Sequence, residues 1–204
     1  MRNKSVELLT KFVDWNEISM SKDLPEYFIR EFSDKVNWHH ISKYQKLSES
    51  FIREFQDKVD WQIVSLYQKL SEDFIREFKD KINWAYISGS QKLSESFIRE
   101  FSHKVEWDYI SQYRVLSEDF IREFKDKVNW TYISLCQNLS ENFIIEFKEF
   151  VDWYIISQHQ ELSYDFIMDH IEYINTEGLQ LNKKIDLTDT QMGAILIAKQ
   201  LLEC

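Results

Sequence analysis

Hydrophobic residues recur along this chain at a fixed interval, which is most visible in its tryptophans. The seven tryptophans lie 23 residues apart: Trp15, Trp38, Trp61, Trp84, Trp107, Trp130 and Trp153. Self-similarity at a period of roughly 20–50 residues is the signature of a repeat architecture. Counted from the residue before each tryptophan, seven repeats of 23 residues fill positions 14–174. We therefore interpret the tryptophans as structural residues of a tandem repeat.

The spacing of apolar residues inside one repeat predicts two short helices. In the second repeat, Trp38, Ile41 and Gln45 recur at helical spacing and so share one face. Phe51 and Phe55 do the same in the second half of that repeat. Two helix starts in 23 residues leave about nine or ten residues for each helix, and such helices are marginal in water on their own. They are therefore expected to pack on their neighbours.

Residues that cap helix N-termini support these two starts. An Asn or Asp such as Asn37 directly precedes each tryptophan, with Glu106 as the exception. Ser48 precedes the second helix of its repeat, and Leu47 and Ile52 bracket it as a hydrophobic staple does. Because one repeat cannot cover its own apolar faces, neighbouring repeats must cover them. The sequence thus predicts an all-α fold, an α-solenoid of seven helix-turn-helix repeats.

The segments outside the repeats are expected to cap the two ends of the solenoid. The N-terminal capping helix, residues 1–13, has its apolar positions at Val6, Leu9, Phe12 and Val13. The C-terminal capping segment, residues 175–204, lacks the tryptophan and the register of the repeats. In that segment Thr188 is the expected helix N-cap, and the residues expected to cover the last repeat are Met192, Ile195, Leu196 and Leu202.

The repeat also carries a resemblance. The string LSESFIREFQDKVDW, residues 47–61, resembles short tandem repeats of uncharacterised proteins of giant DNA viruses. This resemblance implies a helical repeat protein of viral origin and brings no known activity with it. In architecture, the chain is similar to TPR and HEAT arrays, α-solenoids that act mainly as protein-binding scaffolds, so the likeness implies a binding role by analogy alone.

Composition and charge narrow the range of partners. The net charge of -10 opposes binding to the phosphates of nucleic acids and to anionic membrane surfaces. The sequence shows no secretory signal and no apolar run long enough to span a bilayer, and its two cysteines make no disulfide framework. We expect an intracellular protein, in the cytoplasm of a host cell or in a virion.

Catalytic chemistry finds little support in the sequence. A serine recurs in every repeat, as Ser42 does, and a small residue that bonds back to the carbonyl four residues earlier explains it. His39 and His40 are adjacent, so on a helix they point in different directions and chelate one metal poorly. With three isolated glycines the chain has no phosphate-binding loop. No catalytic residue, metal site or cofactor is expected.

The second helices carry a regular charged pattern. Glu49 and Arg53 are four residues apart, as are Arg53 and Asp57, and Glu54 and Lys58. Pairs at this spacing face each other on a helix and stabilise it slightly. We interpret the pattern as a solvated face that supports weak helices, and an acidic-basic docking stripe is the alternative.

The first helices instead carry positions that differ chemically from repeat to repeat. These positions directly follow the tryptophan or lie one turn further on, and tyrosines flank them. Tyrosine is enriched at protein interfaces, although these rings could also fill the seams between repeats. The candidate partner-binding residues are His39, Lys43, Gln62, Leu66, Ala85, Tyr86, Asp108, Tyr109, Gln112, Thr131, Tyr132 and Leu135.

These patterns favour a non-enzymatic scaffold that presents the first-helix face to a partner protein. The alternative is a structural protein that associates with itself, because solenoid ends with weak caps can stack head to tail into homo-oligomers.

Overall fold

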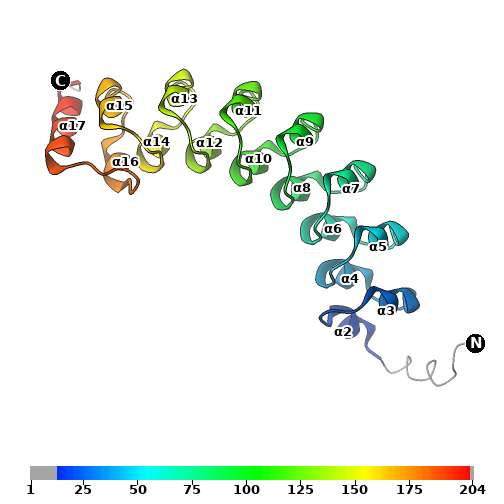
Figure 1. The fold of residues 1–204 in the computed structure, drawn as a ribbon. Coiled ribbons are helices and arrows are strands. Elements are labelled where there is room, and N and C mark those ends of the chain that lie inside the picture. Colours follow the sequence, from blue (N-terminus) through cyan, green and yellow to red (C-terminus); the bar gives the residue numbers. More distant parts are fainter. Residues whose placement is uncertain (1–12, 203–204) are drawn as a thin grey trace, which may run out of the picture. The chain divides into compact units, whose positions relative to one another are not determined.

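A computed structural model describes residues 13–202, and all of its regular elements in that range are α-helices. The helices follow one another in pairs, one pair per 23-residue repeat (Figure 1). The predicted all-α fold, an α-solenoid of 23-residue repeats, is confirmed. The N-terminal capping helix predicted for residues 1–13 falls outside the described residues, apart from Val13.

Each repeat consists of a first helix, which begins at the tryptophan, and a second helix. The first helices are α2 (Trp15–Met20), α4 (Trp38–Tyr44), α6 (Trp61–Tyr67), α8 (Trp84–Ser90), α10 (Trp107–Tyr113), α12 (Trp130–Cys136) and α14 (Trp153–His159). The second helices are α3 (Glu26–Glu31), α5 (Glu49–Glu54), α7 (Glu72–Glu77), α9 (Glu95–Glu100), α11 (Glu118–Glu123), α13 (Glu141–Glu146) and α15 (Tyr164–Asp169). Two further helices, α16 (Thr176–Leu181) and α17 (Asp189–Leu202), follow them.

The helices of the repeats are six or seven residues long, shorter than the sequence predicted. In the second helices the reason lies at the C-cap. Phe55 leaves the helical conformation after α5, and its carbonyl oxygen accepts the backbone N–H groups of Lys58 and Val59. The last turn is thereby tightened and redirected toward the next repeat.

The chain divides into two compact units, Met1–Val105 and Glu106–Cys204. In the first unit the first helices α2, α4, α6 and α8 pack in that order, each on the next. In the second unit α10, α12, α14 and α16 do the same, and α17 packs on α15. Within each unit the second helices form a separate layer beside the first helices (Figure 1). Each unit is therefore a short α-solenoid by itself.

Capping hydrogen bonds fix the helix starts, as the sequence predicted. Asp60 Oδ1 accepts the backbone N–H of Gln62, and Ser48 Oγ accepts that of Phe51. Glu106, the exception in the repeat pattern, caps α10 without a side-chain hydrogen bond. Two N-caps in every 23 residues thus set the length and the phase of the repeat.

The core lies between the first and second helices of the same repeat. Phe97 is fully buried, and the Trp84 ring lies 6.4 Å from the Phe97 ring and 4.9 Å from the Phe101 ring. Trp84 itself is only half-buried, and its indole N–H donates to the Lys79 carbonyl oxygen. The tryptophan ring therefore packs against the second helix of its own repeat, and its indole N–H joins that repeat to the preceding one.

Serine and glutamine side chains join consecutive first helices. Ser65 Oγ donates to the Trp61 carbonyl oxygen and accepts the backbone N–H of Asn83 in the next repeat. The amide of Gln68 donates to the carbonyl oxygens of Ser42 and Gln45 in the preceding repeat. The predicted backbone bond of the serine is thus confirmed, and the serine also caps the neighbouring repeat.

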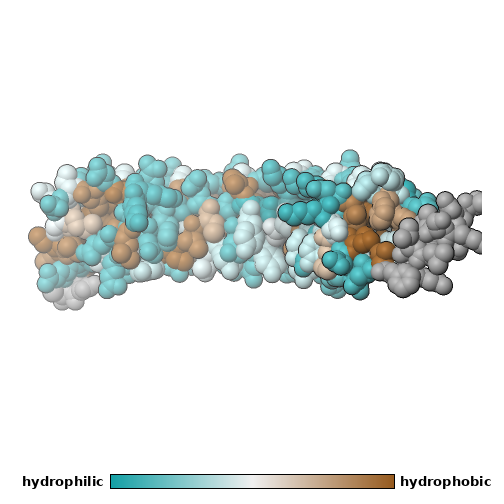
Figure 2. All heavy atoms as spheres, turned by 90° about the horizontal axis from the view of Figure 1, so that it is seen from below, coloured by the Kyte–Doolittle hydropathy of each residue, from teal (hydrophilic) through white to brown (hydrophobic). Residues whose placement is uncertain are grey.

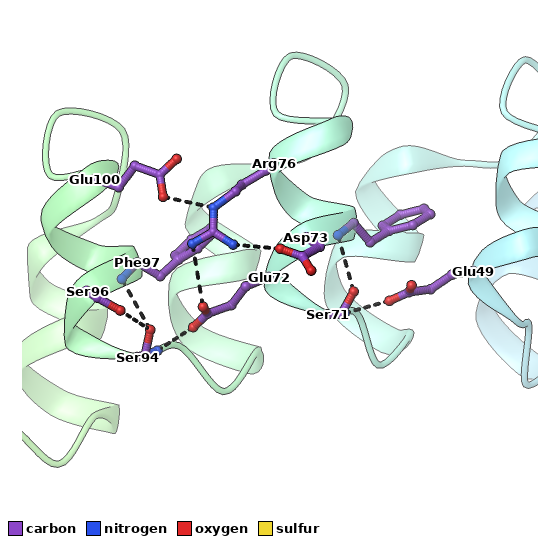
Figure 3. A network of polar contacts seen from close by, with 10 residues as sticks. Glu49, Ser71, Glu72, Asp73, Arg76, Ser94, Ser96, Phe97 and Glu100 are labelled. Carbon is purple, nitrogen blue, oxygen red and sulfur yellow. Dashed lines mark hydrogen bonds and ion pairs between the residues drawn. The ribbon is translucent and has the colours of Figure 1, made fainter.

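Charged side chains join consecutive second helices (Figure 3). Arg76 donates to Glu100 of the next repeat over 2.8 Å, and its guanidinium lies 5.0 Å from the centre of the Phe97 ring. Glu72, 3.7 Å from Arg76, accepts the backbone N–H of Ser94. The hydrogen bond to Glu100 is the main reason that the pKa of Arg76 is raised.

The C-terminal segment begins with a helix that continues the stacking pattern. Asn175 caps α16, and its backbone N–H donates to Ser157 Oγ as in the repeats. Asn182 replaces the glutamine of the repeats. Its side-chain amide donates to the carbonyl oxygens of Ser157 and Gln160 in the preceding repeat. A Cβ at Gly178 would lie 2.8 Å from the Tyr154 carbonyl oxygen, so glycine permits this close packing.

Thr188, which the sequence suggested as the N-cap of the last helix, α17, forms a capping box with Gln191. Gln191 N–H donates to Thr188 Oγ1, and Thr188 N–H donates to Gln191 Oε1. Ile195 is fully buried, whereas Leu196 and Leu202, also expected to cover the last repeat, are exposed. Only one side of this helix therefore lies against the solenoid.

Candidate interaction surface

The candidate partner-binding residues lie on the first helices, and most are exposed. His39, Gln62, Tyr86, Asp108, Tyr109, Thr131 and Leu135 are exposed. Lys43, Leu66, Ala85, Gln112 and Tyr132 are half-buried. None of these twelve side chains is in the buried core. The first unit holds six of them and the second unit the other six.

The position directly after the tryptophan also contributes to stacking, which the sequence did not reveal. His39 Nδ1 lies 2.9 Å from Asp60 Oδ2, the N-cap of the next repeat. Asn129, the N-cap of α12, donates its side-chain amide to Asp108 Oδ1 over 2.8 Å. Where the residue after the tryptophan is His39 or Asp108, its side chain therefore contacts the cap of the following repeat.

The pKa of Asp60, the N-cap of α6, is lowered in the folded chain. Burial by itself raises the pKa of Asp60, but hydrogen bonds from His39 and from the backbone of Ile63 and Gln62 outweigh burial and lower it. The charged form of Asp60 is thus favoured in the folded chain because it serves both as a helix cap and as the partner of His39.

The tyrosines beside this row remain accessible. Tyr86 is 38% exposed and Tyr109 is 41% exposed, and the rings of Tyr109 and Tyr113 lie 6.1 Å apart. Tyr132 is half-buried. The rings cover the seams between repeats only in part, and the remaining surface is open to a partner. Figure 2 shows hydrophobic and hydrophilic patches alternating on the face of the second unit where its first helices lie.

The second-helix side differs from the pattern expected for a solvated face. Arg53 lies 3.9 Å from Glu49 as expected, but its shorter contact, 2.7 Å, is with Glu77 of the next repeat. Lys58 does not pair with Glu54, because its amino group donates to the Ser33 carbonyl oxygen of the preceding repeat. The ion pairs predicted within one helix are therefore only part of the observed contacts. The shorter contacts of Arg53 and Lys58 join neighbouring repeats.

A groove of about 450 Å³ opens in the first unit, where α4 and α6 end. We name it the lysine groove, after Lys43, Lys46 and Lys69, which line it together with Tyr44 and Tyr67. Sequence analysis identified only Lys43. The signal that could have revealed the groove is the tripeptide QKL, which recurs at 45–47, 68–70 and 91–93.

Two further findings concern the described part of the chain. Among residues 13–202, no three side chains of His, Cys, Asp or Glu gather as a metal site requires. None of the described helices has both the length and the apolar composition to cross a membrane.

Comparisons of the chain with protein-family models, curated proteins and solved structures give no significant match.

Proposed function

We propose that the protein is a non-enzymatic scaffold that binds a partner protein on the face of its first helices. One observation carries the proposal: side chains on this face are accessible and differ from repeat to repeat, whereas the recurring glutamines and arginines are engaged in stacking. Gln68 and Arg76 represent the engaged positions, and Gln62 and Tyr86 represent the accessible ones. Specificity for one partner requires a surface that differs from place to place, and this face supplies it.

The test compares two double variants by affinity capture of partners from an extract of the source cells. Ala85→Asp with Gln112→Lys alters the first-helix face, using residue types that Asp108 and Lys43 already place there in other repeats. This variant and the control variant described below should both fold, as judged by circular dichroism. We expect the first-helix variant to lose the captured partner.

The control changes the second-helix side by the same net charge. Ser33→Lys with Ser96→Asp introduces the residue types that Lys79 and Asp73 supply in other repeats. We expect this variant to retain the partner. Loss of the partner from the control variant alone would place the binding face on the other side of the solenoid and overturn the proposal.

Self-association is the second candidate, and the outer side of α17 favours it. Ile197 is 62% exposed and Leu201 is 72% exposed, one helical turn apart, and Leu196 and Leu202 are exposed beside them. Exposed apolar side chains gathered in one place often mark an interaction site, so this helix offers a surface to a second copy. Solution mass measured against concentration separates the two candidates.

The proposal also covers the location of the protein, its origin and the kinds of partner that it does not bind. It assigns the chain a viral origin on the basis of the resemblance of the repeat string at 47–61. It assigns an intracellular place, in a host cytoplasm or a virion, because the sequence has two cysteines and no disulfide framework. It also includes the absence of catalytic activity, because the sequence has no catalytic motif, and the absence of nucleic-acid and membrane partners, supported by the net charge of -10. Binding assays with duplex DNA and anionic vesicles test the last two points.

A further inference from the structure

The lysines of the first unit differ in their surroundings. Two that follow second helices form ion pairs between repeats: Lys81 with Asp57 at 3.3 Å and Lys104 with Asp80 at 3.2 Å. Those after the first helices form a row at 23-residue spacing, Lys46, Lys69 and Lys92, and are exposed. Within residues 13–202, no carboxylate forms an ion pair with any lysine of this row.

The row lies beside the aromatic wall of the lysine groove. Tyr44 is 46% exposed and Tyr67 is 51% exposed, and the Lys43 amino group lies 5.1 Å and 5.7 Å from the centres of their rings. Of the described residues that line the groove, none is acidic. A local positive charge with accessible rings therefore stands on a chain whose net charge is -10.

The basic row is confined to the first unit. The equivalent positions in the second unit are Val115, Asn138 and Glu161. Stacking alone does not require lysine at this position, since the second unit stacks its first helices without it. The lysines are therefore not needed for the stacking of the first helices.

The spacing of the row indicates what it can bind. Packed helices lie roughly 8–10 Å apart, so neighbouring lysines of the row recur at about that interval. A polyproline II segment rises about 3.1 Å per residue with three residues per turn, so every third side chain falls on one side, about 9 Å apart. A β-strand fits less well, because side chains on one of its faces recur at every second residue, only about 6.6 Å apart.

We propose that the lysine groove and its row of lysines bind an acidic peptide segment of a partner protein, extended in polyproline II conformation with a carboxylate at every third residue. The inference rests on the proposed scaffold function and names the chemistry of one of its partners. The carboxylates contact Lys46, Lys69 and Lys92 in turn, while the peptide backbone and apolar side chains lie along Tyr44 and Tyr67.

The experiment titrates the full chain with a fluorescent synthetic peptide at low salt. The peptide has glutamate at every third position, with proline and alanine between. We expect saturable binding that weakens as salt is added. Substitution of the row, Lys46→Gln with Lys69→Gln and Lys92→Gln, should weaken binding about tenfold, because each exposed ion pair contributes a factor of only two or three.

A matched variant separates the groove from the overall charge. Lys79→Gln with Lys125→Gln and Lys183→Gln changes the net charge by the same amount at exposed lysines outside the row. It should bind the peptide as the unaltered chain does. Equal weakening in both triple variants would overturn the proposal.

Two further probes test the register and the class of ligand. A peptide of the same composition with its glutamates adjacent, and a single-stranded oligothymidylate, should both bind more weakly. Equal binding of either would reveal a general polyanion patch and overturn the proposal. The glutamate peptide can fail to bind while the first-helix variant still loses the captured partner. That result would overturn the acidic-peptide site and leave the scaffold function supported.

Discussion

The side-chain amide nitrogen of Gln68 lies 2.7 Å from the backbone carbonyl oxygen of Gln45, its own counterpart one repeat earlier. Gln68 Oε1 also accepts the backbone N–H of Leu47, and the side chain is 6% exposed. One buried amide thus satisfies backbone groups at the point where a first helix ends. The same contact recurs at Gln91 in the first unit and at Gln137 and Gln160 in the second, so these glutamines form a ladder in each solenoid.

Removal of one rung of this ladder should destabilise the protein. Gln68→Ala leaves the carbonyl oxygens of Ser42 and Gln45 and the N–H of Leu47 without their partner in a buried place. We expect a loss of about 2–4 kcal/mol in the free energy of unfolding, since each unsatisfied buried group costs about 1–3 kcal/mol. Urea unfolding followed by circular dichroism measures the change.

The control for this variant is Gln62→Ala on the exposed side of the same helix. It should cost less than about 0.5 kcal/mol, as surface substitutions usually do. Equal losses in the two variants would mean that the buried amide contributes little to stability.

A second prediction concerns the core. Phe97 is fully buried, so Phe97→Ala should cost about 3–5 kcal/mol through lost burial and the cavity left behind. Trp84 is half-buried, so Trp84→Ala should cost less despite its larger side chain. Lys79→Ala, at an exposed position, should cost less than about 0.5 kcal/mol. Thermal melts rank the three variants, and a Trp84 variant less stable than the Phe97 variant would contradict the assigned core.

The repeat, its two helix starts and its buried faces could all be predicted from the sequence, because they depend on local spacing. Ser48 and Asn37 cap helices within four residues of themselves, and such contacts are visible in a single repeat. The pairing of Arg53 with Glu77 was missed, because residues 24 apart meet only once the repeats stack. The lysine groove was missed for the same reason.

The sequence did not reveal that α16 continues the stacking pattern, because the residues that mark a repeat are replaced there. Thr176 stands where the repeats have tryptophan, and Asn182 acts one position earlier than the repeat glutamine. The fifth repeat shows the converse case. Arg114 replaces the ladder glutamine there, yet its backbone carbonyl oxygen still accepts from Gln137 in the next repeat. The hydrogen bonds to the backbone carbonyl oxygens therefore persist where the sequence no longer shows the repeat pattern.

Two truncations test the role of this segment. A chain ending at residue 182 keeps α16 and the bonds of Asn182, and it loses only α17. A chain ending at residue 174 also exposes the groups of α14 that α16 covers, including the Ser157 and Gln160 carbonyl oxygens. Solenoid ends need a polar cap for solubility, so the shorter chain should be less stable and should aggregate.

Thermal melts measure the stability of both truncated chains, and light scattering measures their aggregation. A chain ending at residue 174 that stays monomeric and melts with the full chain would contradict a capping role for α16.

The fourth prediction concerns pH. The pKa of Asp60 is lowered in the folded chain, so its contribution to stability is present above its unfolded pKa of about 3.9. That contribution is lost as the pH falls through the lowered folded value. Asp60→Asn keeps a good N-cap, as Asn37 is in its own repeat, but removes the charge. The variant should therefore lose less stability than the unaltered chain between pH 7 and pH 3.

The control here is Asp34→Asn, which removes an exposed carboxylate outside the helix caps. Thermal midpoints of both variants at the two pH values make the comparison. The same acid-induced fall in the Asp60 variant as in the control would show that the His39–Asp60 contact does not favour the charged form.

The last prediction concerns the outer side of α17. Ile197 and Leu201 lie one turn apart and are mostly exposed, whereas Ile195 on the other side is fully buried against the solenoid. We expect the full chain to associate weakly as its concentration rises, because pairing of this surface between two copies removes apolar area from water. Ile197→Glu with Leu201→Glu should abolish this association and leave the helix content unchanged.

Sedimentation over a wide range of concentration measures the mass, and Lys79→Gln with Lys125→Gln is the control with the same change in net charge. Association that survives in the α17 variant would place the self-contact elsewhere on the chain. A mass that stays monomeric at every concentration would remove self-association as a function and leave the exposed side of α17 available to a different protein. In that case the scaffold has two partner surfaces, the first-helix face and this last helix, and capture with the α17 variant would then lose one partner and keep the other.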